Sequence, residues 1–182
     1  MSNLRRVLLP SVLSGVLATL WLHLASLRAA DGIPRTNGQP ELSIDRPLWQ
    51  DFDTDGRLAR ELAALSLEKW PGENRARLTE PQLQLVDGQQ QRWWVQARLG
   101  WLDEDEQRLQ LEQQVRLQRE PQTGGLVVTT ETLRIDERDG LIETDQAVVL
   151  TSGNWHFTAT GLRAALGRQQ LQLLGNVRGI HD

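Results

Sequence analysis

Residues 108–118, RLQLEQQVRLQ, alternate apolar and polar side chains and indicate the fold of most of this chain. The apolar members Leu109, Leu111, Val115 and Leu117 are separated by Gln, Glu and Arg. Successive side chains of a β-strand point to opposite faces of the sheet, so this period of two predicts a strand with one apolar face.

Other stretches repeat this alternation at a spacing of roughly ten residues. Their apolar members are Leu83, Leu85, Val128, Leu133, Ile135, Ile142, Val148, Leu150, Phe157, Leu162, Leu171, Leu173 and Val177. Turn-forming pairs such as Pro71-Gly72 and Asp139-Gly140 separate them. Short alternating runs with such turns predict an antiparallel all-β sandwich or roll. The Leu58–Leu67 stretch, LARELAALSL, has a helix-like composition, but its short length and flanking glycines favour a strand.

A weak internal repeat supports a bent strand. The pattern Leu109-x-Leu111-x-x-x-Val115 recurs as Leu171-x-Leu173-x-x-x-Val177, where Gly175 lies at the central position. A strand that kinks or bulges at its centre and then resumes on the same face produces this pattern.

The N-terminal region has a different character. No charged residue occurs between Val7 and Leu27, and a helix of that length reaches about 30 Å, the thickness of a bilayer core. Arg5 and Arg6 precede this run, which predicts a cytoplasmic N-terminus. We therefore expect a cytoplasmic segment at 1–6, a transmembrane anchor at 7–27, a tether at 28–47 and a periplasmic β domain at 48–182.

The alternative for this run is a cleaved secretory signal. Cleavage requires small residues three positions apart, and the candidate sites would place His23, Leu27 or Arg28 at the −3 position, which favours an uncleaved anchor. One face of the expected helix carries mostly small residues. This face permits close packing against another membrane helix, or the small residues are only those common in any membrane span. The residues of this face are Ser11, Gly15, Ala18, Leu22 and Ala25.

Composition and motifs exclude several classes of function. The 182 residues carry a net charge of −4, which argues against a nucleic-acid-binding protein, and no cysteine, which excludes disulfides and thiolate chemistry. The three histidines lack ligand spacing, and no phosphate loop or nucleophile elbow is present. The acidic run Asp103–Glu106 suits a divalent cation or, more simply, a solvated hairpin. We therefore expect no catalytic residue, no metal and no cofactor.

A set of short strings carries a family resemblance. They are Gly56-Arg57-Leu58, Glu80-Pro81-Gln82-Leu83, Trp93-Trp94-Val95-Gln96-Ala97, Leu109-x-Leu111-x-x-x-Val115, Thr130-Glu131-Thr132-Leu133-x-Ile135, Thr144-Asp145, Gly161-Leu162 and Leu173-x-Gly175-x-Val177. In this order they resemble the LptC family, the lipopolysaccharide export component of Gram-negative inner membranes, over essentially the whole chain. The family often has Gly where this chain has Gln113.

The resemblance implies an open, V-shaped antiparallel β-jellyroll behind one transmembrane helix in the inner membrane. It also implies a non-enzymatic role: the protein receives lipopolysaccharide from the LptB–LptF–LptG ABC transporter and passes it to LptA. The resemblance implies that the apolar interior holds acyl chains, and the alternation fits this because same-parity positions share one face of a strand. The residues predicted to line this groove are Leu78, Leu83, Leu85, Leu109, Leu111, Val115, Leu117, Leu133, Ile135, Val148 and Leu150.

The resemblance further implies that the C-terminal β edge docks LptA. The apolar and glycine positions of that edge are Leu171, Leu173, Gly175 and Val177. The opposite edge, near Trp49 to Leu58, is expected to meet the periplasmic domain of the transporter.

A second hypothesis is an anchored periplasmic carbohydrate-binding or scaffold domain. In that case the inward Leu and Val residues only fill a closed β-sandwich, and exposed Trp rings bind the ligand or partner. Trp93 and Trp94 are adjacent in a predicted strand, so one ring belongs to the core and the other is more exposed.

Overall fold

The computed structural model describes residues 38–86, 90–103, 107–119, 125–136, 139–165 and 170–181. The chain divides into two units, Met1–Gln39 and Pro40–Asp182. Only Gly38 and Gln39 of the first unit are described, so the expected membrane anchor at 7–27 lies outside the described residues. Within the described residues, no helix is long and apolar enough to cross a membrane.

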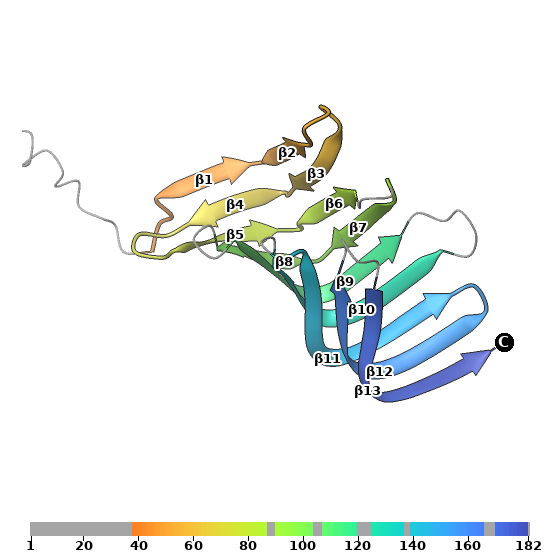
Figure 1. Cartoon of the computed structure of the whole chain (residues 1–182). Coiled ribbons are helices and arrows are strands. Elements are labelled where there is room, and N and C mark those ends of the chain that lie inside the picture. The colour runs from red at the N-terminus through yellow and green to blue at the C-terminus, as the bar shows by residue number, and fades with distance from the viewer. Residues whose placement is uncertain are drawn as a thin grey trace, which may run out of the picture. The chain divides into compact units, whose positions relative to one another are not determined.

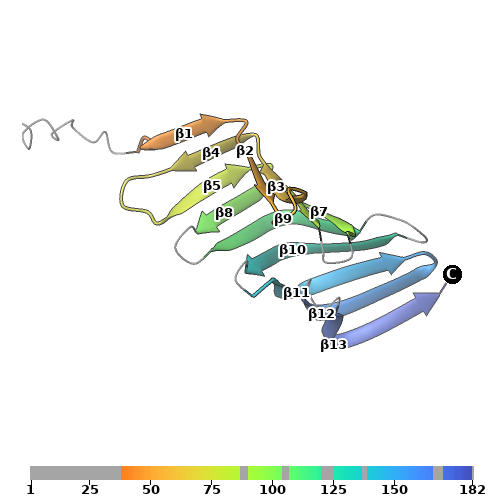
Figure 2. The same ribbon diagram turned by 45° about the horizontal axis from the view of Figure 1, so that its top comes forward.

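The second unit is one antiparallel β-sheet (Figure 1). Its strands are β1 (Leu42–Asp45), β2 (Leu48–Phe52), β3 (Leu58–Ala63), β4 (Ser66–Lys69), β5 (Arg75–Thr79), β6 (Gln82–Val86), β7 (Arg92–Gln96), β8 (Leu99–Asp103), β9 (Arg108–Arg119), β10 (Leu126–Asp136), β11 (Leu141–Ser152), β12 (Trp155–Ala165) and β13 (Gln170–His181). The main order is β1-β4-β5-β8-β9-β10-β11-β12-β13, and Figure 2 shows this succession. The strands β2, β3, β6 and β7 form a second branch that joins at β9.

The branching follows from the length of β9. Its first half pairs with β8, from Arg108 to Glu112, and its second half pairs with β7, from Arg116 to Arg119. The short strands β7 and β8 therefore occupy the place of one long, interrupted strand beside β9. The short strands β5 and β6 likewise take the place of one long strand, because β5 pairs with β8 and β6 pairs with β7. The strands β4 and β3 do so again, because β4 pairs with β5 and β3 pairs with β6.

A corner runs across the sheet where these interruptions occur. Backbone hydrogen bonds join its residues from strand to strand: Leu65 N donates to Thr79 O at 2.8 Å, Glu80 N to Arg98 O at 2.9 Å, and Arg98 N to Gln113 O at 3.0 Å. In the long strands the corner is a bulge, since the register shifts between Thr130 and Thr132 and again along β11, β12 and β13. These long strands bend visibly in Figure 1.

The corner divides the sheet into two half-sheets. The first half-sheet contains β1, β4, β5 and β8 with residues 108–112, 132–136, 141–144, 161–165 and 170–173. The second contains β2, β3, β6 and β7 with residues 115–119, 126–130, 147–152, 155–160 and 175–181. Buried apolar side chains of both half-sheets belong to one core cluster, so their inner faces pack against each other.

The predicted kinks are confirmed. Gln113 and Gln114 have φ angles of 66° and 57°, and Asn176, next to Gly175, has a φ of 49°. Leu111 and Val115 on either side of the first kink are both buried in the core. The left-handed conformation therefore occurs at Gln113, where the resembling family often has Gly, at a cost of about 1 kcal/mol for a non-glycine residue.

The strand expected within Leu58–Leu67 is confirmed, although the corner at Ala64 and Leu65 divides it between β3 and β4. The expectation for Trp93 and Trp94 also holds, since Trp93 is buried and Trp94 is half-buried on the outer face. One difference concerns the tether at 28–47: β1 lies inside this range and pairs with β4. Pro47, the last residue of the expected tether, is buried at the corner between β1 and β2.

Candidate lipid-binding face

The inner face of the first half-sheet is a row of aliphatic residues in register. Leu67 pairs with Leu78, Leu78 with Gly100, Gly100 with Leu111, and Leu111 with Leu133. Leu78 and Leu111 have an exposed fraction of 0%. Direct cross-strand neighbours on one face pack side by side, so this row forms a continuous apolar surface.

Gly100 interrupts the row for a steric reason. A Cβ atom at this position would lie 3.1 Å from Pro81 Cγ and 3.4 Å from both Leu111 Cδ2 and Leu78 Cβ. The neighbouring side chains therefore fill the space above the glycine, and the apolar surface is continuous across it.

The second half-sheet carries a matching row. Register pairs connect the inward-facing residues across six strands. They are Leu62, Leu83, Val95, Leu117, Val128 and Leu150. All six are buried and belong to the same core cluster as the row of the first half-sheet.

The eleven predicted groove residues all lie on this inner face. Ten of them are buried members of the core cluster, and Leu85 is half-buried against it. The structure adds inward residues that the predicted set omitted, among them Val95, Val128, Ile142 and Leu162. These four belong to alternating runs, so the parity of their strands is the signal that could have found them.

The inner face reaches solvent at both ends of the sheet. Ile44 of β1 pairs with Leu67 and is 36% exposed, and Trp49 of β2 pairs with Leu62 and is 39% exposed. At the other end Val177 of β13 is 50% exposed. In the described part of the sheet, β1, β2 and β13 each have a single neighbouring strand, so both ends of the sheet are free edges.

The predicted C-terminal edge residues follow this pattern. Leu171 and Leu173 are half-buried and pair with Ala164 and Leu162, whereas Val177 is exposed. Gly175 pairs with Thr160 at the corner. The predicted helix-packing residues Ser11, Gly15, Ala18, Leu22 and Ala25 lie outside the described residues, as does the acidic run after Asp103. Among the described residues, no cluster of acidic or histidine side chains could hold a metal ion.

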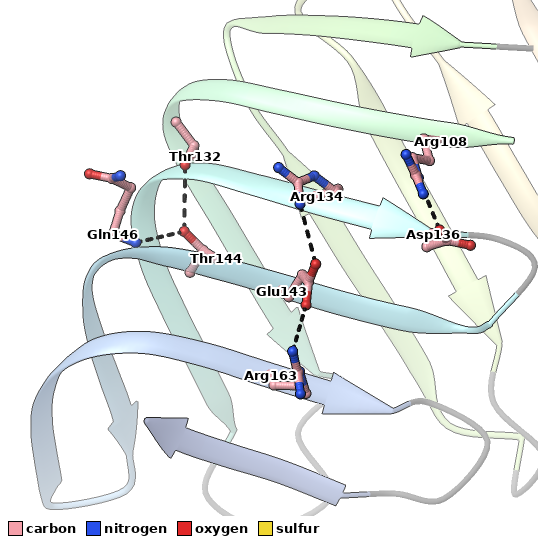
Figure 3. A network of polar contacts seen from close by, with 8 residues as sticks. All are labelled: Arg108, Thr132, Arg134, Asp136, Glu143, Thr144, Gln146 and Arg163. Carbon is pink, nitrogen blue, oxygen red and sulfur yellow. Dashed lines mark hydrogen bonds and ion pairs between the residues drawn. The ribbon is translucent and has the colours of Figure 1, made fainter. Parts of the chain in front are cut away.

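The outer face of the first half-sheet is polar. Arg134 Nη1 donates to Glu143 Oε1 at 3.3 Å, and Arg163 Nη2 donates to Glu143 Oε2 at 3.2 Å. Arg108 Nε donates to Asp136 Oδ2 at 3.1 Å in the same region (Figure 3). Aliphatic residues thus face inward and ion pairs face water, which is the alternation read from the sequence.

A single sheet folded at a corner, apolar inside and open at both edges, is an open β-roll. The structure is similar to the crystal structure of LptH from Pseudomonas aeruginosa, described as the LptA homologous periplasmic component of the conserved lipopolysaccharide transport device. The TM-score is 0.53 at 8% sequence identity, and the match covers 68% of this chain and 94% of that chain. No curated protein sequence matches the chain.

The family described as lipopolysaccharide-assembly, LptC-related, matches residues 12–182. The chain therefore belongs to the LptC family. It is a non-enzymatic component of lipopolysaccharide transport, of the periplasmic bridge type.

Proposed function

We propose that this protein is anchored in the inner membrane, receives lipopolysaccharide from the LptB–LptF–LptG transporter and passes it along its inner face to LptA. The observation that supports this role is the two inward rows, which begin at Ile44 and at Trp49 on one free edge and extend across the sheet toward β13 on the other. A closed sandwich, as the carbohydrate-binding hypothesis requires, would need two sheets, whereas the described strands form one open sheet.

Burial of acyl chains supplies the driving force for such a role. Each CH₂ group removed from water contributes about 0.8 kcal/mol, so several chains bind strongly without any polar contact. In the centre, the two half-sheets fill the space between them with their own side chains. At the edges the inward residues already contact solvent. We therefore infer that acyl chains load at an edge and displace the central leucines as they advance.

Photo-crosslinking from opposite faces of one strand tests the lipid path. A photoreactive residue at Leu173, inward and half-buried, should label with lipopolysaccharide in membranes that produce it, whereas one at Gln172, outward and exposed, should not. Leu133 and Arg134 provide the same comparison in the centre of the sheet. Equal labelling from inward and outward positions would exclude the inner face as the path.

The handover to LptA is proposed to use strand addition at β13. A free edge offers backbone donors and acceptors to a new strand, and an added strand would continue the apolar face into the next protein. Val177→Pro removes one donor and distorts β13, so we expect a loss of LptA capture with membrane anchoring retained.

Val177→Thr is the matched control for this substitution, because it keeps both the backbone donor and a β-branched side chain. Both variants are compared by co-purification with LptA from membranes. If LptA capture survives deletion of residues 170–182 in a folded protein, the docking edge is not β13.

A further inference from the structure

The inner face of the second half-sheet changes character at its rim, the row of inward positions farthest from the corner. The row next to it is aliphatic and contains Leu83, Val95, Leu117 and Val128. The rim carries polar and aromatic residues among its members instead. In register order the rim contains Asp51, Arg60, Leu85, Trp93 and Arg119, then Leu126 and Ser152, and then Trp155 and His181.

Arg119 is the central cation of this rim. Its guanidinium lies 5.6 Å from the centroid of the Trp93 ring, which is buried in the core cluster. The side chain is exposed, and it forms no ion pair with another described residue. A guanidinium that is held beside an aromatic ring and remains exposed keeps its donors accessible, and such donors suit a phosphate group.

A second aromatic group lies near the C-terminal edge, where Trp155 and His181 belong to the rim and Phe157 belongs to the row next to it. The rings of Trp155 and Phe157 stack with centroids 5.8 Å apart, and His181 meets Trp155 edge-on at 4.5 Å. Trp155 nevertheless remains 48% exposed. A large ring that is fixed by its neighbours but open to solvent is a platform for a second flat, partly apolar ligand such as a sugar ring.

We propose that this rim binds the phosphorylated saccharide head of an anionic glycolipid, while the neighbouring aliphatic row takes its acyl chains. Arg119 contacts the phosphate, and Trp155 stacks on the sugar. The proposal rests on the function proposed above and assigns the polar part of the same ligand. It explains why cationic and aromatic residues share this rim, although an acyl chain alone needs neither.

Binding of two forms of lipopolysaccharide tests the proposal. The probes are purified lipopolysaccharide and the same material after phosphatase treatment, titrated against the full chain in lipid nanodiscs. Arg119→Gln should weaken binding of the phosphorylated form about tenfold and leave the dephosphorylated form unchanged, because only the charge-assisted contact is lost. Trp155→Leu should weaken both forms by a similar factor, because both retain the sugar.

Two matched controls come from the outer face. Arg116 lies on the same strand as Arg119 with opposite parity, and Trp101 lies in β8 beneath Arg75. Arg116→Gln and Trp101→Leu should leave both affinities unchanged. Melting temperatures of all variants establish that each remains folded.

The outcomes separate the two proposals. If the unmodified protein binds neither form, the lipid-transfer function and the rim proposal both fail. If it binds both forms equally and Arg119→Gln changes nothing, only the rim proposal fails. If phosphatidylglycerol competes with the same dependence on Arg119 and with no dependence on Trp155, the rim recognises phosphate without a saccharide, which also overturns the proposal.

Discussion

The centre and the edges of the inner face share one alternating pattern but differ in exposure. Leu111 in β9 and Leu173 in β13 both face inward, yet Leu111 is completely buried and Leu173 is only half-buried. β9 has strands on both sides and a facing half-sheet, whereas β13 has one neighbouring strand. Parity therefore decides which way a side chain points, and the position of the strand in the sheet decides how much water it loses.

The largest expected effect contrasts these two leucines. Leu111→Ala leaves a cavity between Leu78 and Leu133 and should destabilise the fold by about 3 to 4 kcal/mol. Leu173→Ala should cost about 1 kcal/mol, because solvent already reaches the side chain. Urea unfolding of the full chain, followed by tryptophan fluorescence, measures both. Equal losses would mean that the edge is as tightly packed as the centre.

Two glycines provide a smaller contrast. Gly100→Ala adds a methyl group 3.1 Å from Pro81 Cγ and should destabilise by about 1 to 2 kcal/mol. Gly175→Ala places its Cβ no closer than 3.5 Å to a neighbour, at Thr160 O, so its effect should stay within about 0.5 kcal/mol. Thermal unfolding of the two variants, scanned side by side, measures the difference. An unchanged unfolding temperature for Gly100→Ala would show that the centre of the inner face can accommodate an extra methyl group.

The smallest expected effect concerns the outer face. Glu143→Gln removes the charge that Arg134 and Arg163 share. Both arginine side chains are more than half exposed, so solvent screens these pairs and the loss should remain below about 1 kcal/mol. Raising the salt concentration should reduce the difference between variant and parent further. A loss as large as that of Leu111→Ala would show that the outer face is essential to the fold.

Local pattern was sufficient to predict the all-β class and the direction of the inward residues. The alternation around Leu109 and Leu117 persists in β9, and the repeat at Val115 and Val177 marks true irregularities. The branching of the sheet was not predictable in the same way. It depends on the corner at Ala97-Arg98, where no repeat, glycine or proline marks the break and the hydrogen bond from Arg98 N to Gln113 O defines it.

The rim and the free edges also required the structure. Arg119 lies two residues after Leu117, the last apolar residue of its strand, so the sequence alone predicts an ordinary solvent-exposed strand end. Only the strand register shows that it lies beside Trp93. Likewise the three prolines, two glycines and lack of periodicity in residues 28–47 predict a tether, whereas β1 within this range is defined only by its pairing with β4. Contacts between residues far apart in sequence decide such positions.

The pairing of β9 with both β7 and β8 sets an order for folding. From β9 to β13 every strand pairs with its successor, so this meander closes through short loops and can form quickly. Before β9 the hairpins β2-β3, β4-β5 and β6-β7 are joined by pairings that skip along the chain, as β1 pairs with β4, β3 with β6 and β5 with β8. The two early branches meet only at β9. During synthesis, the first half of the domain therefore cannot complete its sheet until β9, the strand that joins its two branches, has been made.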